Sequence, residues 1–373
     1  MTGPGRTGPL SDVRVLEMHA IGPVPFCAML LAGMGADVVH VARPGFRAER
    51  HDATRRGRRA VEADLKSPEG AGLVRDLASR ADILLEGSRP GVMERLGLGP
   101  DPLLAANPRL VYGRMTGWGQ TGPLSRRAGH DINYIALSGA LHAIGREGAR
   151  PVPPLNLVGD YGGGALFLAM GVAAALHEAR GGGRGQVVDA AMLDGSASLM
   201  SLFCGFAAAG TWREERGANL LDGGAPWYDT YETADGRFVA VGALEEPFWQ
   251  ALLDGLGIAP DDLPPRDDRA SWPAIRERLA AAFGSQDRDA WSARFADSDA
   301  CVTPVLPLSE AAGHPHSALR EVFRVADGAV RPAPAPRFDR PAREPGPWER
   351  LAPADALAAW HARDAMQPGG TRD

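Results

Sequence analysis

Two glycine-flanked segments of the chain carry the side chains best suited to proton transfer. The first reads Gly129-His130-Asp131-Ile132-Asn133-Tyr134, and the second reads Leu155-Asn156-Leu157-Val158-Gly159-Asp160-Tyr161-Gly162-Gly163-Gly164. An imidazole and a carboxylate can together remove a proton from one face of a carbon and return it on the opposite face. These residue types therefore indicate racemase or epimerase chemistry.

Each of the two groups also has a purely structural interpretation. Asp160 can simply cap a helix that begins at Tyr161, and His130 can be a structural histidine on a loop. The catalytic interpretation also gives the three glycines after Tyr161 a role. Because glycine has no Cβ, their backbone N–H groups can come close to a ligand. At the positive end of a helix, these groups would stabilise a developing oxyanion. The residues alone leave both interpretations open.

Basic side chains lie near the ends of several predicted strands. Arg43 follows a strand over 36–41, Arg89 follows one over 81–85, and Arg95 lies shortly beyond it. Lys66 stands just before a predicted helix. Because ligands of α/β folds bind at the carboxyl ends of parallel strands, these positions could hold a multiply phosphorylated ligand. They could equally form a solvated basic face.

Strand-like and helix-like segments alternate in the first half of the chain. The helix over 67–78 is the most clearly marked, since Ser67 can cap it, Pro68 fits its first position and Glu69 its first turn. This alternation predicts an α/β fold with a Rossmann-like parallel sheet covered by helices. The predicted strands are 13–16, 36–41, 81–85, 110–115 and 186–189, and the predicted helices are 22–33, 67–78, 92–97, 161–179 and 190–207.

The character of the sequence changes in its second half. A hairpin turn at Ala234-Asp235-Gly236 is followed by helical segments that carry Trp249, Trp272 and Trp291, which predicts a smaller α+β domain. We therefore expect a large Rossmann-like domain over 1–190 that is completed by about 334–373, a linker helix and loop over 191–228, the small domain over 229–317, and a return linker over 318–333.

Composition favours a soluble protein of a reduced compartment. The net charge of −6 gives no general attraction to nucleic acid. Cys27, Cys204 and Cys301 show neither metal nor disulfide spacing. The first residues lack the layout of a signal peptide, and the apolar run 165–176 is better interpreted as a buried helix than as a membrane span. We expect a cytoplasmic protein without nucleic-acid or membrane partners.

Two other patterns are discounted. Gly117-Trp118-Gly119-Gln120-Thr121-Gly122 fits the spacing of a dinucleotide-binding loop, but Pro123 follows it and no amphipathic helix begins there. His314 and His316 have no neighbouring pattern of carboxylates or cysteines, so no metal site is predicted.

Longer motifs point to a family. The segments 114–123 (Arg-Met-Thr-Gly-Trp-Gly-Gln-Thr-Gly-Pro) and 223–231 (Gly-Gly-Ala-Pro-Trp-Tyr-Asp-Thr-Tyr), with the His130 and Asp160 segments, resemble the class III CoA-transferase (CaiB/BaiF) superfamily, and within it the α-methylacyl-CoA racemases. The resemblance runs from Leu10 to about Arg340. It implies that His130 and Asp160 are the catalytic acid/base pair, and that Glu245 orients the histidine across the subunit interface of an interlocked homodimer.

The resemblance also implies an acyl-CoA thioester substrate, with coenzyme A bound as part of the substrate and no prosthetic group. Further binding positions surround the catalytic pair. The positions implied for the nucleotide and pyrophosphate are Arg43, Ala63, Asp64, Leu65, Lys66, Gly87, Ser88, Arg89 and Arg95, and those around the catalytic pair are Gly129, Asp131, Ile132, Asn133, Tyr134, Gly159, Tyr161, Gly162, Gly163 and Gly164.

The expected activity is that of an isomerase of lipid metabolism, which interconverts (R)- and (S)-2-methylacyl-CoA through an enolate. One alternative is a CoA transferase in which Asp160 forms an acyl anhydride. That mechanism has no need for His130, and transferases of this superfamily usually lack a histidine at its place. A non-catalytic CoA-binding protein and a Rossmann dehydrogenase are more distant alternatives.

Overall fold

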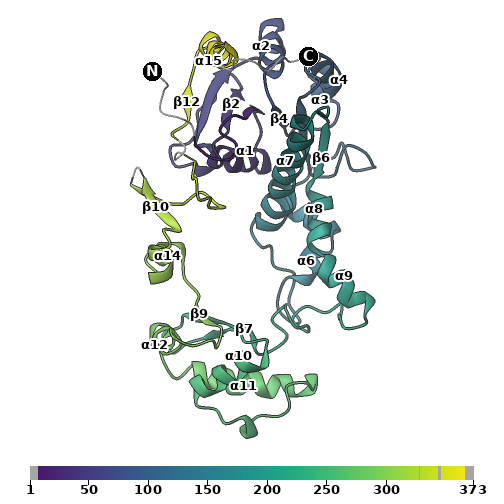
Figure 1. The fold of residues 1–373 in the computed structure, drawn as a ribbon. Coiled ribbons are helices and arrows are strands. Elements are labelled where there is room, and N and C mark those ends of the chain that lie inside the picture. Colours follow the sequence, from purple (N-terminus) through teal and green to yellow (C-terminus); the bar gives the residue numbers. More distant parts are fainter. Residues whose placement is uncertain (1–6, 327, 343–345, 366–373) are drawn as a thin grey trace. The chain divides into compact units, whose positions relative to one another are not determined.

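The computed structural model describes residues 7–326, 328–342 and 346–365. Internal contacts divide the chain into two compact units. Unit 1 comprises Met1–Ser138, Pro154–Met200 and Val325–Asp373, and unit 2 comprises Gly139–Pro153 and Ser201–Arg324. Each unit is described by itself below, with the elements labelled as in Figure 1.

Unit 1 is built on a seven-stranded sheet with the order β12-β3-β2-β1-β4-β5-β6. All the paired neighbours in it are parallel, which confirms the predicted α/β fold class. The strands are β1 (Arg14–Met18), β2 (Asp37–Ala42), β3 (Arg58–Glu62), β4 (Ile83–Glu86), β5 (Val111–Thr116), β6 (Val187–Ala191) and β12 (Glu349–Arg350).

Two of these strands were not predicted. β3 reads Arg-Arg-Ala-Val-Glu and is too polar to resemble a buried parallel strand, although Arg58 within it is 1% exposed. β12 has two residues and pairs with β3 from the far end of the chain. Both depend on contacts between distant segments, which a local pattern does not reveal.

Helices cover both faces of the sheet (Figure 1). α1 (Pro23–Gly33) and α7 (Phe167–Arg180) pack on Val15, Ile83 and Leu85, whereas α2 (Pro68–Ala78) and α15 (Pro353–Ala365) pack on the side of Leu16 and Leu84. The other helices of unit 1 are α3 (Val92–Arg95), α4 (Pro100–Ala106), α5 (Asp131–Leu137) and α8 (Met192–Leu199), with a 3₁₀ turn η1 (Ala53–Arg55). The predicted cap is confirmed, since Ser67 Oγ accepts a hydrogen bond from the Gly70 N–H at 3.0 Å.

The helix that carries Asp160 differs from the prediction. A π-helix, η2 (Leu157–Leu166), begins after Asn156 and runs directly into α7. Its wider turn is seen in the bond from the Tyr161 N–H to the Asn156 carbonyl, at 3.3 Å. Asp160 therefore lies inside the first turn, and the expectation that it caps a helix beginning at Tyr161 is wrong. π-helical segments are rare and often occur at functional sites.

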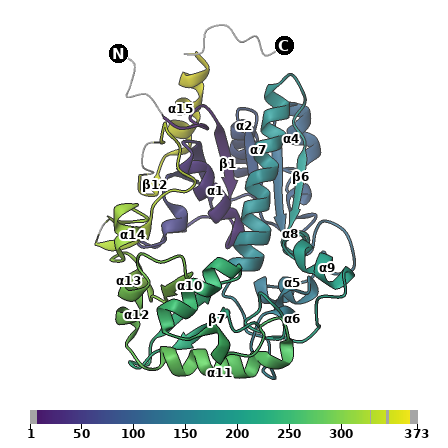
Figure 2. The ribbon, with the colours of Figure 1, turned by 60° about the horizontal axis from the view of Figure 1, so that its bottom comes forward.

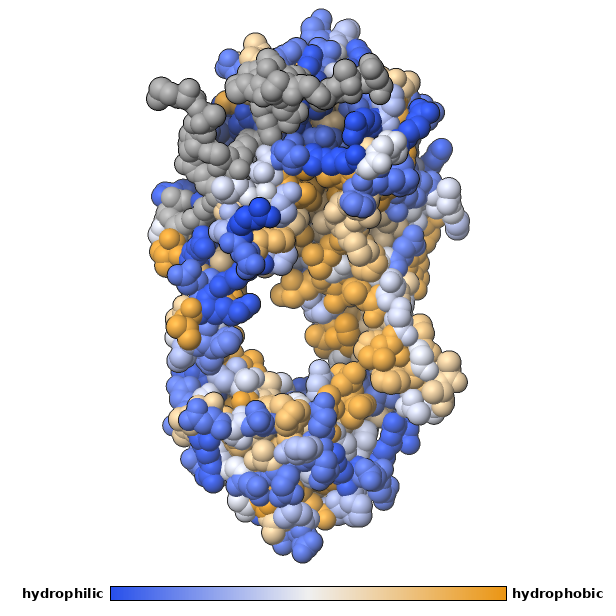
Figure 3. Space-filling view, viewed as in Figure 1, coloured by the Kyte–Doolittle hydropathy of each residue, from blue (hydrophilic) through white to orange (hydrophobic). Residues whose placement is uncertain are grey.

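The combined helix Leu157–Arg180 is long and apolar enough to cross a membrane by length and composition, with 33% of its most apolar window buried. In unit 1 it lies against the sheet. Leu168 and Val172 are buried in the core and pack directly over Gly113 of β5. The predicted buried helix is therefore buried on one side only. Exposed apolar side chains remain on its other side, as Figure 3 shows over α7 and α8.

Unit 2 contains an antiparallel sheet with the order β7-β8-β9. Thr230 in β7 pairs with Ala240 in β8, which confirms the predicted hairpin. The three predicted tryptophan-bearing helices are also present, with Trp249 in α10, Trp272 in α11 and Trp291 in α12 (Figure 2). The strands are β7 (Tyr228–Glu232), β8 (Phe238–Gly242) and β9 (Val302–Pro304), and the helices are α6 (Ala140–Ala143), α9 (Ser201–Ala208), α10 (Glu246–Leu256), α11 (Trp272–Phe283), α12 (Arg288–Arg294), α13 (Leu308–Ala311) and α14 (Pro315–Leu319), with 3₁₀ turns η3 (Pro260–Asp262) and η4 (Arg269–Ser271).

One predicted helix is divided. The apolar segment 190–207 forms two helices, α8 and α9, which are interrupted at Met200 and belong to different units. A further two-stranded sheet pairs β10 (Phe323–Ala326) with β11 (Ala329–Pro332). The prediction from continuous apolar residues therefore made this helix too long. Apolar residues continue through the point at which the chain passes from unit 1 to unit 2, so they do not mark the helix end.

Candidate active site

His130 occupies the N-cap position of α5, with an exposed side chain. Asn133 holds its backbone, because the His130 N–H donates to Asn133 Oδ1 at 3.0 Å and the His130 carbonyl accepts from the Asn133 N–H at 2.8 Å. The preceding Gly129 has no room for a side chain, since an added Cβ would lie 2.7 Å from the ring of Tyr134. The backbone is thus fixed while the imidazole is accessible.

Asp131 joins the two predicted segments. Its side chain is buried, and its Oδ2 accepts a hydrogen bond of 2.7 Å from the backbone N–H of Asp160. The contact is tight enough to require glycine before Asp160, because a Cβ on Gly159 would lie 2.5 Å from Asp131 Oδ2. The segments that carry His130 and Asp160 are therefore neighbours in space, as the acid/base hypothesis requires.

The Asp160 carboxylate is half-buried beside the start of α1. Its Oδ2 accepts a hydrogen bond of 3.2 Å from Asn156 Nδ2, and a Cβ on Gly22 would lie 3.0 Å from the same oxygen. Burial raises the pKa of Asp160, and the nearby Asp131 charge raises it further. The Asn156 hydrogen bond and the charge of His130 act in the opposite direction on this pKa. The imidazole is thus close enough to influence the carboxyl group.

Replacement of Asn156 should change the pH profile of any reaction in which ionised Asp160 is the base. Asn156 donates to the charged carboxylate, so Asn156→Ala removes a contact that lowers the pKa of Asp160. The already raised pKa then rises further, and ionised Asp160 is lost at a higher pH on acidification. The acidic limb of kcat against pH should move to higher pH, and an unmoved limb would contradict the assignment.

The glycines after Tyr161 have a packing role that the sequence did not suggest. A Cβ on Gly163 would lie 2.6 Å from the Ser196 nitrogen, and one on Gly164 would lie 2.8 Å from Met192 Cγ. On the opposite helix α8, a Cβ on Gly195 would lie 1.8 Å from the Gly163 carbonyl oxygen. The glycines thus allow the backbones of η2 and α8 to meet. This contact accounts for Gly163 and Gly164 without a ligand.

Substitution of Gly195 should therefore be costly. Gly195→Ala forces η2 away from α8, and overpacking of this kind costs roughly 1–3 kcal/mol, sometimes more. Activity should fall as well, because η2 carries Asp160. Gly72→Ala in α2 is the matched control, since no atom lies within 4 Å of its added Cβ. Chemical denaturation should separate the two variants, and equal stabilities would contradict the packing argument.

Three of the four predicted basic positions lie in a pocket of about 410 Å³ at the carboxyl ends of β2 and β3. Arg43, the segment 63–66 and Arg95 line it together, as the strand-end argument predicted. Gly87, Ser88 and Arg89 follow β4 and are not among the lining residues. Burial raises the pKa of Tyr134, and the charge of Arg89 opposes this rise.

Glu245 stands at the N-cap of α10 in unit 2 and is exposed. Burial raises the pKa of Cys301, and the charge of Glu245 raises this pKa further. Its predicted role in orienting His130 across a subunit interface stays a prediction. Among the described residues, no group of three or more His, Cys, Asp or Glu is arranged to hold a metal ion.

Sequence reasoning missed three residues of this region. Asn156 precedes Asp160 by one helical turn, a spacing that could have suggested the contact. Gly22 and His19 come from the loop after β1, and His19 lines the basic pocket. Both are far from the motifs in sequence, so only the sheet brings them to the site.

Known proteins match the chain over most of its length. A family model described as CoA-transferase family III matches residues 10–355. The chain is 48% identical to the alpha-methylacyl-CoA racemase of Mus musculus, over 88% of this chain and 85% of that protein. It is 47% identical to the alpha-methylacyl-CoA racemase of Homo sapiens, over 88% and 86%. A succinyl-CoA–D-citramalate CoA-transferase from Chloroflexus aurantiacus is 37% identical over 67% of this chain and 65% of its own.

Solved structures share the fold. A CAIB/BAIF family protein from Brucella suis superposes with a TM-score of 0.80 at 24% identity, covering 96% of this chain and all of that one (100%). Rv3272 from M. tuberculosis superposes with a TM-score of 0.76 at 26% identity, covering 95% and 99%. The family match extends over residues of both units, and the chain belongs to CoA-transferase family III.

Proposed function

We propose that the protein is a racemase of 2-methylacyl-CoA thioesters, with His130 and Asp160 as its acid/base pair. The observation that carries the proposal is the hydrogen bond from the Asp160 N–H to Asp131, which ties the two segments together. Relatives named alpha-methylacyl-CoA racemase, at 47–48% identity, support the same reaction.

The chemistry follows from the acidity of a carbon beside a thioester. Loss of its proton gives an enolate, whose oxygen needs hydrogen-bond donors where the charge develops. The Asp131 backbone N–H is the better candidate donor, because the first N–H groups of a helix lack intrahelical partners. The glycines of η2 are less suited, since Gly163 and Gly164 are buried against α8.

Proton transfer then takes place from opposite faces of the planar enolate. In one direction ionised Asp160 accepts the proton and protonated His130 donates one, and in the other neutral His130 accepts and neutral Asp160 donates. A raised pKa of Asp160 suits this exchange of roles, because it brings the carboxyl group nearer to the pKa range of an imidazole. Each residue serves one enantiomer.

The basic pocket is suited to the phosphorylated end of coenzyme A, which binds as part of the substrate without a prosthetic group. Arg43, Lys66 and Arg95 supply positive charge, while Val41, Leu65 and other apolar residues of the lining suit a flat heterocycle. Exposed apolar residues over η2, α7 and α8 offer a surface on which an acyl chain can move (Figure 3). These residues are Leu157, Leu166, Met170 and Leu199.

Loss of a pocket cation should weaken substrate binding and leave chemistry unchanged. A charge-assisted hydrogen bond contributes about 1.5–3 kcal/mol, so Arg43→Ala should raise KM roughly tenfold or more while kcat is retained. Arg109→Ala, an exposed arginine of the same unit outside the pocket, is the control. Steady-state kinetics with a 2-methylacyl-CoA would measure both constants. A fall in kcat alone would place Arg43 elsewhere in the mechanism.

The proposal is tested by incubating one pure enantiomer of a 2-methylacyl-CoA with the protein in deuterated water, without an acceptor acid. Deuterium at the α-carbon and formation of both epimers are expected. Acyl-CoA formation from an added carboxylic acid, without washout of the α-proton, would instead support the transferase alternative, in which Asp160 attacks the thioester. Binding of coenzyme A without either reaction would instead support the hypothesis of a non-catalytic CoA-binding protein.

Four finer predictions belong to the same proposal. A homodimer would supply Glu245 to the partner's site, which light scattering and complementation between inactive His130 and Glu245 variants can test. A cytoplasmic location and a role in lipid metabolism are proposed with it. We propose no nucleic-acid or membrane partner.

A further inference from the structure

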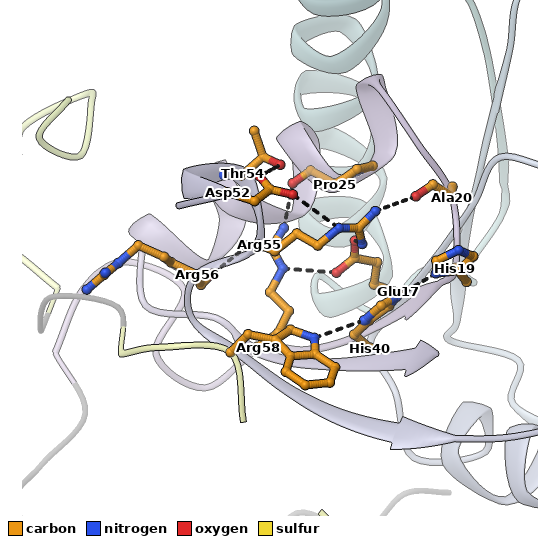
Figure 4. Close-up of polar contacts among 11 residues, drawn as sticks. Glu17, His19, Ala20, Pro25, His40, Asp52, Thr54, Arg55, Arg56 and Arg58 are labelled. Carbon is orange, nitrogen blue, oxygen red and sulfur yellow. Dashed lines mark hydrogen bonds and ion pairs between the residues drawn. The ribbon is translucent and has the colours of Figure 1, made fainter. Parts of the chain in front are cut away.

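A row of ring nitrogens runs from Trp348 through the buried His40 to His19, which lines the basic pocket. The indole Nε1–H of Trp348 donates to His40 Nδ1 at 3.2 Å, and His40 Nε2 lies 3.4 Å from His19 Nδ1. Figure 4 shows the two imidazoles side by side, with the second nitrogen of His19 turned away from His40. His40 is fully buried, whereas His19 is partly exposed and lines the pocket with Arg43.

The indole group decides where the protons of this row reside. An indole N–H can donate and cannot accept, so Nδ1 of His40 must be the acceptor. Neutral His40 then carries its proton on Nε2, which faces His19. Nδ1 of His19 therefore accepts a hydrogen bond from the His40 Nε2–H. The proton of neutral His19 must then lie on its own Nε2. One tryptophan thus sets the tautomer of two histidines.

Burial is the main reason why both rings are neutral near pH 7, and the surrounding charges modify its effect. Burial lowers the pKa of His40 to about 4, with Glu17 opposing and Arg55, His19 and Arg58 adding to the effect. Burial also lowers the pKa of His19, helped by Arg55 and Arg43 and opposed by Glu17. The Glu17 carboxylate is already paired with Arg58 at 2.9 Å, which limits its support for an imidazolium (Figure 4).

We propose that Trp348 and His40 form a tautomer relay that fixes His19 as a neutral Nε2–H donor to a phosphate oxygen of bound coenzyme A. The inference rests on the proposed function, because that function supplies the ligand. The three basic side chains of the pocket provide charge, and His19 provides a directional bond. A fixed neutral donor keeps this bond independent of pH through the range in which an ordinary histidine titrates.

The relay is tested first without any ligand. In protein with ¹⁵N-labelled histidine, long-range ¹H–¹⁵N correlation should show His19 and His40 as Nε2–H tautomers, unchanged between about pH 6 and 8. Trp348→Phe keeps an aromatic ring and removes the donor, so Nδ1–H forms should appear at both histidines. Trp360→Phe is the control, because that indole donates to Asp37 instead, at 3.1 Å. Nδ1–H tautomers in the parent protein would overturn the relay.

The donor is tested by calorimetric binding of coenzyme A without turnover. A neutral hydrogen bond contributes about 0.5–1.5 kcal/mol, so His19→Phe should weaken binding about 3- to 10-fold. His19→Gln, which places an amide N–H near the position of Nε2, should recover most of the affinity. Dephospho-coenzyme A, which lacks the 3′-phosphate, identifies the phosphate concerned. A loss for both ligands indicates the pyrophosphate, and a loss for coenzyme A alone indicates the 3′-phosphate.

The outcomes separate this inference from the proposed function. Equal affinities of the parent and His19→Phe for both ligands, in a protein that still racemises its substrate, would overturn the role of His19 and leave the function intact. A parent protein that binds no coenzyme A would overturn both. The Trp348→Phe variant should bind coenzyme A more weakly than the Trp360→Phe control. Equal binding by these two variants would contradict the coupling of tautomer to affinity.

Discussion

His130→Gln and Asp160→Asn, made separately, should each reduce racemisation by about 10²- to 10⁴-fold, the contribution of a positioned acid or base. Each variant keeps one base, which can still remove a proton from the enantiomer that it serves. The enolate is then reprotonated by the same group, from the same face. The product is the starting enantiomer with deuterium at its α-carbon.

The two variants should therefore exchange opposite enantiomers. Each is incubated with pure (R)- and pure (S)-2-methylacyl-CoA in deuterated water, and exchange is followed by mass spectrometry or NMR. His177→Gln, an exposed histidine on α7 in the same unit, is the control and should racemise normally. Exchange of the same enantiomer by both variants would contradict a two-base mechanism.

Affinity for coenzyme A supplies the second control on these variants. Asp160 and His130 are assigned to chemistry, so neither replacement should weaken the binding of coenzyme A by more than a few-fold. The Asp131–Asp160 contact uses the backbone N–H of Asp160 and should survive Asp160→Asn. A large loss of binding would count against the catalytic assignment and favour a structural role.

Arg58→Met should be the most destabilising single substitution considered. Arg58 and Glu17 are 1% and 0% exposed, and Arg58 Nε lies 2.9 Å from Glu17 Oε2. Arg58 also donates to the carbonyls of Arg56 and Pro25, so it joins β3 to the start of α1. Arg58→Met leaves the buried Glu17 carboxylate with only the longer contact to Arg55, at 4.0 Å. Removal of the close partner of a buried ion pair costs about 3–5 kcal/mol.

Chemical denaturation of the full chain would measure this loss, with Arg47→Met as control. The pair between Arg47 and Glu62 has the same chemistry at 3.2 Å, but the arginine is 67% exposed, and surface pairs contribute about 0–1 kcal/mol. The double variant Glu17→Gln with Arg58→Met should be more stable than Arg58→Met alone, because it removes the buried Glu17 carboxylate while Arg55 keeps its contact with Asp52 at 3.4 Å. Equal losses of unfolding free energy in Arg58→Met and Arg47→Met would show that burial does not determine the cost of removing an ion pair.

Local patterns predicted much of the fold because they report local physics. The cap at Ser67 and the hairpin around Asp235 depend on backbone groups within a few residues, and both are present. β3 was missed because Arg58 within it is buried by pairing with Glu17, a contact made across 41 residues. The helix at Asp160 was displaced because its first turn is held by Asp131, across 29 residues.

The sequence by itself determined the alternating α/β architecture and the residue types of the site, His130, Asp160 and the strand-end cations, because alternation and side-chain chemistry are local properties. The tertiary structure decided which groups act on one another. It brings the carboxylate of Asp131 into a hydrogen bond with the Asp160 N–H and packs η2 against α8. It also brings Trp348 into contact with His40, 308 residues away in the sequence. Hydrogen bonds and burial between such distant segments set pKa values and tautomers, and they exist only once the sheet has formed.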